Sequence, residues 1–142
     1  VQAECSDLLT ANELSIIQSY DSSEIMVNLD GGKTYRIFEN LFTNIGKYSM
    51  ERSRVYINVK EIDDEVIIEF KNISKTQMNF TPEEIIERFV RGDKSRHESG
   101  SGLGLAIVKS FTEIQGGSFQ INIDGDLFKT IITFKKAVDQ AH

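Results

Sequence analysis

A glycine run that leads directly into an apolar helical pattern constrains this chain more than any other feature. Gly100, Gly102 and Gly104 alternate with other residues in Gly-Ser-Gly-Leu-Gly-Leu, and the helical pattern continues over 106–115. Glycine lets the backbone approach a ligand closely, because it has no Cβ and adopts positive φ at little cost. The helix N-terminus adds unpaired N–H groups and the positive end of the helix dipole. We therefore expect an anion site here, most naturally for phosphate, with a flexible linker as the alternative for this stretch taken alone.

Length and composition fit one soluble domain. The 142 residues suffice for a core of their own, and we expect a single domain over 1–142, with its core at about 14–135, a helix remnant at 1–13 and a tail at 136–142. The net charge of -6 argues against a nucleic-acid-binding surface. A single cysteine, Cys5, excludes an internal disulfide and suits a reducing compartment. No apolar run reaches membrane-spanning length, so this domain is not expected to enter a membrane.

Three segments have the pattern of helices. Apolar residues repeat with helical spacing over 33–49. A second helix is expected to begin at Thr81, a capping residue followed by Pro82. The third follows the glycine run, and its expected buried stripe consists of Leu103, Ile107, Phe111 and Ile114.

Strand patterns lie before, between and after these helices. The expected strands are 14–19, 24–29, 54–60, 65–70, 118–123 and 127–134. Asp30-Gly31-Gly32 is expected to break the second strand, and 71–80 to be irregular. The last four strands pair as two hairpins, the second through the turn signal Asp124-Gly125. This order predicts one mixed sheet with helices on one face.

A polar edge runs along the first predicted helix. Asn40, Asn44, Lys47 and Tyr48 lie at positions i, i+4, i+7 and i+8. Asparagine is unfavourable inside a helix, so a ligand is one explanation for this pair of asparagines. A solvated polar edge is the other.

Three motifs together resemble a known family. In chain order they are Glu39-Asn-Leu-Phe-Thr-Asn-Ile-Gly-Lys-Tyr-Ser, Glu87-Arg-Phe-Val-Arg-Gly-Asp-Lys-Ser-Arg and Gly100-Ser-Gly-Leu-Gly-Leu-Ala-Ile-Val-Lys. They resemble the N, F and second glycine boxes of the ATP-binding domain of sensor histidine kinases, in the gyrase, Hsp90, histidine kinase and MutL ATPase superfamily. The resemblance implies an α/β (α+β) two-layer sandwich, the Bergerat fold, whose mixed, mainly antiparallel sheet is backed by about three helices.

The resemblance also implies roles for the polar edge of the first helix. Asn44 would coordinate Mg²⁺ through its amide oxygen, and Asn40 would reach the same region. Lys47 would contact phosphate oxygens, or be a solvated surface charge. Tyr48 would line the sugar or base of ATP, or belong to the core.

Further phosphate contacts are implied in the second half of the chain. Arg91 and Arg96 would meet the β- and γ-phosphates, although Arg96 could also be a surface charge. The segment 93–99 would form a mobile lid with Phe89 as a packing anchor. The expected phosphate loop contains Gly100, Gly102, Leu103 and Gly104.

The chain departs from the family pattern in its first glycine box, Asp-x-Gly-x-Gly. The corresponding segment is Phe70-Lys-Asn-Ile-Ser-Lys, with Asn72 in the place of the aspartate that reads adenine. The amide oxygen of Asn72 would still accept a hydrogen bond from the adenine amino group, but a weaker one than a carboxylate accepts.

The phospho-accepting histidine of the family also has no counterpart, because His97 lies in the expected lid and His142 at the chain end. The resemblance thus implies the Mg-ATP-binding catalytic domain of a bacterial two-component sensor histidine kinase. It would donate the γ-phosphate to a histidine on a separate dimerisation domain, which also meets the response regulator. We expect a cytoplasmic domain of a membrane-anchored kinase. The alternatives are a free-standing serine kinase of the anti-sigma-factor type and a degenerate, non-catalytic nucleotide-binding module.

Overall fold

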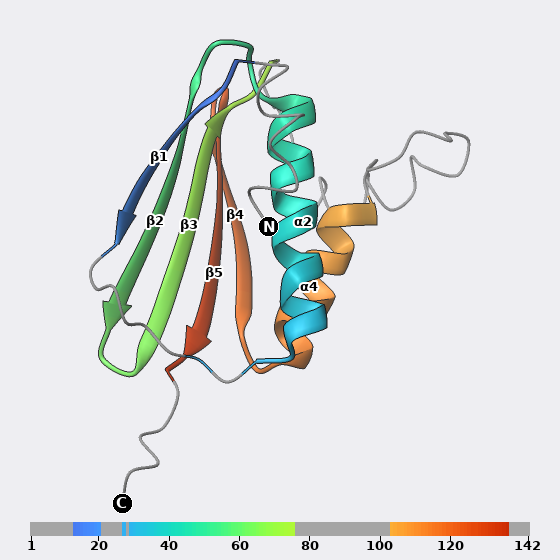
Figure 1. The fold of residues 1–142 in the computed structure, drawn as a ribbon, viewed down its shortest axis with the longest axis vertical. Coiled ribbons are helices and arrows are strands. Elements are labelled where there is room, and N and C mark those ends of the chain that lie inside the picture. Colours follow the sequence, from blue (N-terminus) through green and yellow to red (C-terminus); the bar gives the residue numbers. More distant parts are fainter. Residues whose placement is uncertain (1–12, 21–26, 28, 76–102, 137–142) are drawn as a thin grey trace, which may run out of the picture.

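A computed structural model describes residues 13–20, 27, 29–75 and 103–136. In chain order the elements of these ranges are β1 (Ser15–Tyr20), α2 (Gly31–Tyr48), β2 (Arg54–Ile62), β3 (Glu65–Ile73), α4 (Leu103–Ile114), β4 (Ser118–Asp124) and β5 (Leu127–Lys135). The strands form one sheet in the order β1-β2-β3-β5-β4. Both helices cover the same face of this sheet (Figure 1). The predicted two-layer α/β sandwich is therefore confirmed.

The sheet is mixed and mainly antiparallel, as expected. Only β1 and β2 are parallel, while β2–β3, β3–β5 and β5–β4 are antiparallel. Side chains alternate between the two faces, so β5 directs Thr130, Ile132 and Phe134 into the core. The register places Asn72 of β3 opposite Phe128 of β5. A polar side chain thereby enters the layer between sheet and helices.

Helix α2 begins two residues earlier than the periodicity predicts. Asp30 is its N-cap: its Oδ1 accepts a hydrogen bond from the backbone N–H of Lys33 at 2.9 Å. This hydrogen bond, together with the nearby Lys33 ammonium, lowers the pKa of the Asp30 carboxyl. Asp30-Gly31-Gly32 is therefore a helix start and not merely a strand break, because the cap satisfies an N–H that the first turn leaves unpaired.

The predicted buried stripe of α4 is only partly right. Phe111 packs against the core as predicted, but the buried side chains of α4 are Leu105, Val108 and Thr112, and Ile114 is 64% exposed. Ile107 and Phe111 are half-buried, and the side chain of Leu103 lies outside the described part of the chain. The N-terminal half of α4 is apolar on nearly every side, so periodicity does not determine which face is buried.

Three other predictions about the elements need correction. The first concerns the strand predicted at 24–29: Val27 and Leu29 are not in a strand but pack against the hydrophobic core. The other residues of 24–29 lie outside the described ranges. Strand β3 continues to Ile73, so the irregular segment begins later than predicted. Glu13 has a φ of 54°, which excludes a helix there. The rest of the predicted N-terminal helix, the Thr81 helix and the tail from 137 lie outside the described residues.

The two helices run antiparallel. The backbone N–H of Asp30, before α2, donates to Oε1 of Gln115, just after α4, at 2.6 Å. Near the other end of the pair, a Cβ added to Gly104 would lie 3.1 Å from Oδ1 of Asn40. This packing brings the N-terminus of α4 to the middle of α2. Neither helix of the described ranges is long and apolar enough to cross a membrane.

Candidate functional site

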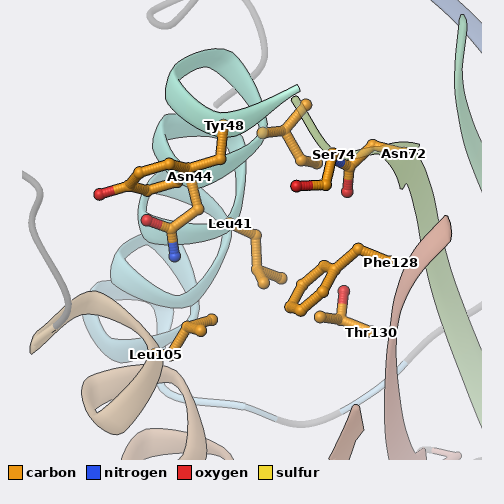
Figure 2. A pocket seen from close by; sticks show the side chains of 9 residues that line it. Leu41, Asn44, Tyr48, Asn72, Ser74, Leu105, Phe128 and Thr130 are labelled. Carbon is orange, nitrogen blue, oxygen red and sulfur yellow. The ribbon is translucent and has the colours of Figure 1, made fainter. Parts of the chain in front are cut away.

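A cavity lies between α2, the start of α4 and the sheet, and Figure 2 shows its side chains. The described residues that line it are Leu41, Asn44, Ile45, Tyr48, Asn72, Ser74, Leu105, Phe128 and Thr130. None of these residues is charged, and the polar ones carry amide or hydroxyl groups. An apolar cavity with a few polar groups is typical of a small-molecule site.

On the sheet side, the cavity is lined by the buried amide of Asn72. Asn72 is 5% exposed, and its Nδ2 donates to Oγ of Ser49 at 2.8 Å. Ser49, which follows α2, is fully buried. Two backbone hydrogen bonds join the same segments, from Met50 N–H to Ile73 C=O at 2.7 Å and from Lys75 N–H to Tyr48 C=O at 2.9 Å. The backbone that carries Asn72 is therefore held by the junction of α2 and β3, and its amide lies beside Ser49. We call this part of the cavity the base end and define it by the lining residues Asn72, Ser74, Phe128 and Thr130, together with Ser49, which lies behind the lining as the partner of Asn72.

Several residues of the base end are not predicted from the sequence. Thr130 is 3% exposed and lies on β5, two residues beyond the register partner of Asn72. A signal for it exists, since Thr130 interrupts the apolar side of a strand whose other inward residues are apolar. No comparable signal marks Ser49 or Ser74, because only the pairing of β3 with the end of α2 brings them together.

Two of the predicted asparagines lie on the α4 side: Asn44 lines the cavity, and Asn40 lies one turn earlier on α2, against Gly104. Nδ2 of Asn40 donates to the Arg36 carbonyl at 2.8 Å, while its Oδ1 faces Gly104. Gly104 lies in the first turn of α4, where backbone N–H groups have no partner within the helix. We call Asn40, Asn44 and Gly104 the phosphate end.

Asn44 is unusual within the described part of the chain. Its Nδ2 is buried and has no hydrogen-bond partner there. In Figure 2 the amide projects from α2 beside Tyr48 and above Leu41. A buried amide donor without a partner costs free energy, and native structures contain few of them. Thr112 Oγ1 is also buried without a partner, but only Asn44 lines the cavity, so its amide is the group that we expect a ligand there to satisfy.

Comparison with known proteins decides the family. Residues 30–139 match the family of histidine kinase-, DNA gyrase B-, and HSP90-like ATPases. The chain belongs to this ATPase family. The resemblance seen in the sequence motifs is thereby confirmed.

Individual relatives include a sensor histidine kinase and a heme sensor protein. The chain is 40% identical over 83 residues to the sensor histidine kinase HprS of Escherichia coli, covering 58% of this chain and 18% of that protein. It is 30% identical over 128 residues to the heme sensor protein HssS of Staphylococcus saprophyticus, covering 89% of this chain and 27% of that protein. The chain thus spans less than a third of either relative, and it corresponds to a histidine kinase ATPase domain.

A solved structure supports the same fold. The catalytic domain of the histidine kinase ThkA, in a nucleotide-free form, superposes with a TM-score of 0.79 at 18% identity. The match covers 95% of this chain and 87% of that chain. The arrangement of helices and sheet seen here is therefore that of a histidine kinase catalytic domain.

The donor set of this ATPase domain fits Mg²⁺ only in combination with a ligand. The described residues contain no cluster of three or more His, Cys, Asp or Glu side chains that could hold a metal ion. Mg²⁺ commonly keeps several waters and takes one or two protein oxygens together with substrate phosphates. The carboxamide oxygen of Asn44 suits such a role, because no described residue holds the amide in one orientation. Lys47, in the last turn of α2, adds a positive charge nearby in the sequence.

The structure brings together some of the predicted site residues. Asn44, Tyr48 and Asn72 line one cavity, and Asn40 adjoins Gly104. The remaining ones, with the lid and its anchor, lie outside the described residues: Arg91, Arg96, Gly100, Gly102, the segment 93–99 and Phe89. Leu103 begins α4, but nothing is described of its side chain. Their roles stay predictions.

Proposed function

We propose that this domain binds Mg-ATP across the cavity and donates the γ-phosphate to a histidine on a separate dimerisation domain of a sensor histidine kinase. The observation that carries the proposal is the buried, unpartnered amide of Asn44, which lies between an apolar cavity and the N-terminus of a helix. A ligand with an aromatic base at one end and phosphates at the other matches both neighbours of Asn44.

The purine base would occupy the base end. A flat heteroaromatic ring gains from contact with the apolar side chains of Leu41, Leu105 and Phe128. The buried amide of Asn72 would form a hydrogen bond with the edge of the ring.

The phosphates would lie at the phosphate end. Unpaired N–H groups and the positive dipole end of α4 favour an anion at Gly104. Asn40 and Asn44 would reach the phosphates and Mg²⁺ from α2, with Lys47, Arg91 and Arg96 as further cationic contacts. Mg²⁺ would neutralise charge on the transferred group when bound. The protein residues would act by positioning and charge neutralisation, since phosphoryl transfer needs little covalent chemistry from the enzyme.

The partners follow from the relatives. Sensor kinases such as HprS and HssS are several times longer than this chain. We therefore place this domain on the cytoplasmic side of a membrane-anchored kinase, beside a dimerisation domain that carries the histidine and passes its phosphate to a response regulator. The anti-sigma-factor type of serine kinase and a degenerate module are not favoured, because the matching relatives are sensor kinases.

A thermal-shift titration tests the proposal. A ligand that binds only the folded state adds RT ln(1 + [L]/Kd) to stability, roughly 2.7 kcal/mol at about 100 times Kd. We expect Mg-ATP to raise the melting temperature, and EDTA to reduce the shift. No shift at millimolar Mg-ATP would contradict the proposal and favour the degenerate module. Incubation with radiolabelled ATP should leave this chain unlabelled, so stable phosphorylation of His97 would contradict transfer to another domain.

A further inference from the structure

The base end has polar groups that do not favour one hydrogen-bonding pattern. The described side chains there contribute the amide of Asn72 and the hydroxyls of Ser49, Ser74 and Thr130. A hydroxyl donates or accepts as its partner requires, and a carboxamide carries an acceptor on one side and a donor on the other. A carboxylate at the position of Asn72 would only accept, whereas these groups offer both functions.

The hydroxyl of Ser49, the partner of Asn72, can form a hydrogen bond with either end of the amide. In the structure Nδ2 of Asn72 donates to Oγ of Ser49 at 2.8 Å. Half a turn of the amide about its last torsion would exchange the two atoms, and the Ser49 hydroxyl would then donate to Oδ1 of Asn72. Both orientations keep a hydrogen bond to Ser49, which is fully buried and held by the backbone bonds at Met50 and Lys75. The amide can therefore keep a hydrogen bond to Ser49 in either orientation.

Each state presents a different atom to a ligand. With Nδ2 on Ser49, the amide offers Oδ1, which accepts from a 6-amino purine such as adenine. In the turned state it offers Nδ2, which donates to a 6-oxo purine such as hypoxanthine or guanine. The ring nitrogen next to this position also changes, from an acceptor in adenine to a donor in the 6-oxo bases. The Thr130 hydroxyl, 3% exposed in the same cavity, can pair with either form.

We infer that the base end accepts 6-amino and 6-oxo purine nucleotides alike, with Asn72 as the residue that sets this tolerance. The inference rests on the proposed function, because it requires that the base lies in this cavity. It adds that the domain does not restrict its phosphate donor to ATP.

ATP and ITP form a matched pair for the test, since ITP carries the 6-oxo group without the additional 2-amino group of GTP. Their Mg-dependent dissociation constants are measured by calorimetry on the parent and two variants. We expect parent constants for ATP and ITP within about threefold of one another, since both complexes make neutral hydrogen bonds of similar strength. Asn72→Asp creates a fixed acceptor that the Ser49 hydroxyl can still satisfy, and ATP should then be preferred by roughly tenfold or more.

Asn72→Leu is the control for the role of the amide, because leucine has a similar size and neither donates nor accepts. It should weaken both nucleotides by a similar factor and leave their ratio near one. A structural role for Asn72 alone would leave the ratio unchanged in the Asp variant, and that result overturns the inference. A parent that prefers ATP by more than about tenfold, a difference of 1.4 kcal/mol, overturns it without any variant. Failure of both nucleotides to bind overturns the proposed function as well, so the two failures are distinguishable.

Discussion

The base end and the phosphate end of the cavity differ in how the protein itself satisfies their polar groups. At the base end, Asn72 and Ser49 are buried and hydrogen-bonded to each other. At the phosphate end, Asn44 buries an amide donor with no partner among the described residues, and Asn40 faces a helix N-terminus. The Asn72–Ser49 pair is thus satisfied within the fold, whereas in our proposal a ligand satisfies the Asn44 amide.

The difference has an energetic consequence. A group that the fold already satisfies contributes to stability, and its loss leaves a buried partner unpaired. A buried polar group without a partner lowers the stability of the free protein, and a ligand that forms a hydrogen bond with it removes this cost. Changes near the base end should therefore lower stability, and changes at the phosphate end should lower affinity alone.

Leu41→Ala should have the largest effect, because it tests the core beneath the base end. Leu41 is 2% exposed and lines both the cavity and the hydrophobic core. Truncation of a buried leucine costs roughly 2–5 kcal/mol, and urea unfolding measures it. Glu39→Ala on the same helix is the control: the Glu39 side chain is 40% exposed and, among the described residues, pairs only with the exposed Arg36, so stability should change by about 0.5 kcal/mol or less. A loss below 1 kcal/mol for Leu41→Ala would mean that the base end is not supported by the core.

Asn44→Ala tests the opposite end and should separate stability from affinity. The ligand-free domain should unfold at the same or a slightly higher urea concentration, since the change removes an unpaired buried amide and alanine favours the helix. Affinity for Mg-ATP should fall about tenfold or more, the loss expected for a hydrogen bond to a charged group. Thr43→Ala, one position earlier on α2 and outside the cavity lining, is the matched control. Unchanged affinity in Asn44→Ala would exclude the role in phosphate or metal binding.

Gly104 and Gly117 allow the effect on affinity to be compared with the effect on stability. A Cβ on Gly104 would meet only the side-chain end of Asn40, at 3.1 Å, whereas a Cβ on Gly117 would lie 2.6 Å from the Thr133 carbonyl. Gly117→Ala should therefore destabilise the fold by roughly 1–3 kcal/mol in urea unfolding. Gly104→Ala should keep the fold and weaken Mg-ATP binding several-fold, since a methyl group crowds the N–H groups that approach phosphate. The reverse pattern would place the ligand away from α4.

Asp30 provides the smallest effect, at the end of α2 far from the cavity. Its pKa is lowered in the folded state by the Lys33 N–H hydrogen bond and the Lys33 charge. The carboxylate therefore contributes stability above its unfolded pKa, and this contribution is lost as pH falls through the lowered folded value. Asp30→Asn keeps an acceptor for the cap and removes the charge. Melting temperatures of parent and variant should differ at pH 7 and converge at acid pH, with no change in Mg-ATP affinity; a constant difference would contradict the assignment.

The sequence predicts most of the fold because local signals agree with it. The strict alternation of Val55, Ile57 and Val59 and the turn at Asp124-Gly125 lead to hairpins that the structure contains. The buried face of α4 is predicted only in part, because apolar residues lie on nearly every side of its N-terminal half. In the site, Asn40 and Asn44 are predicted from their helical spacing, and Asn72 is predicted from its place in the first glycine box. The Ser49–Asn72 pair could not be predicted, since it depends on two segments that meet only when β3 returns to the end of α2.

Whether one ligand joins the two ends of the cavity can be measured by NMR titration of the backbone and asparagine side-chain amides. Adenosine should shift signals of the base end, including Asn72 and Thr130. Mg-tripolyphosphate should shift Gly104 and the side-chain amide of Asn44, and Mg-ATP should shift both sets together with one dissociation constant. Shifts from Mg-ATP that avoid either set, or two separate constants for the two sets, would contradict the account.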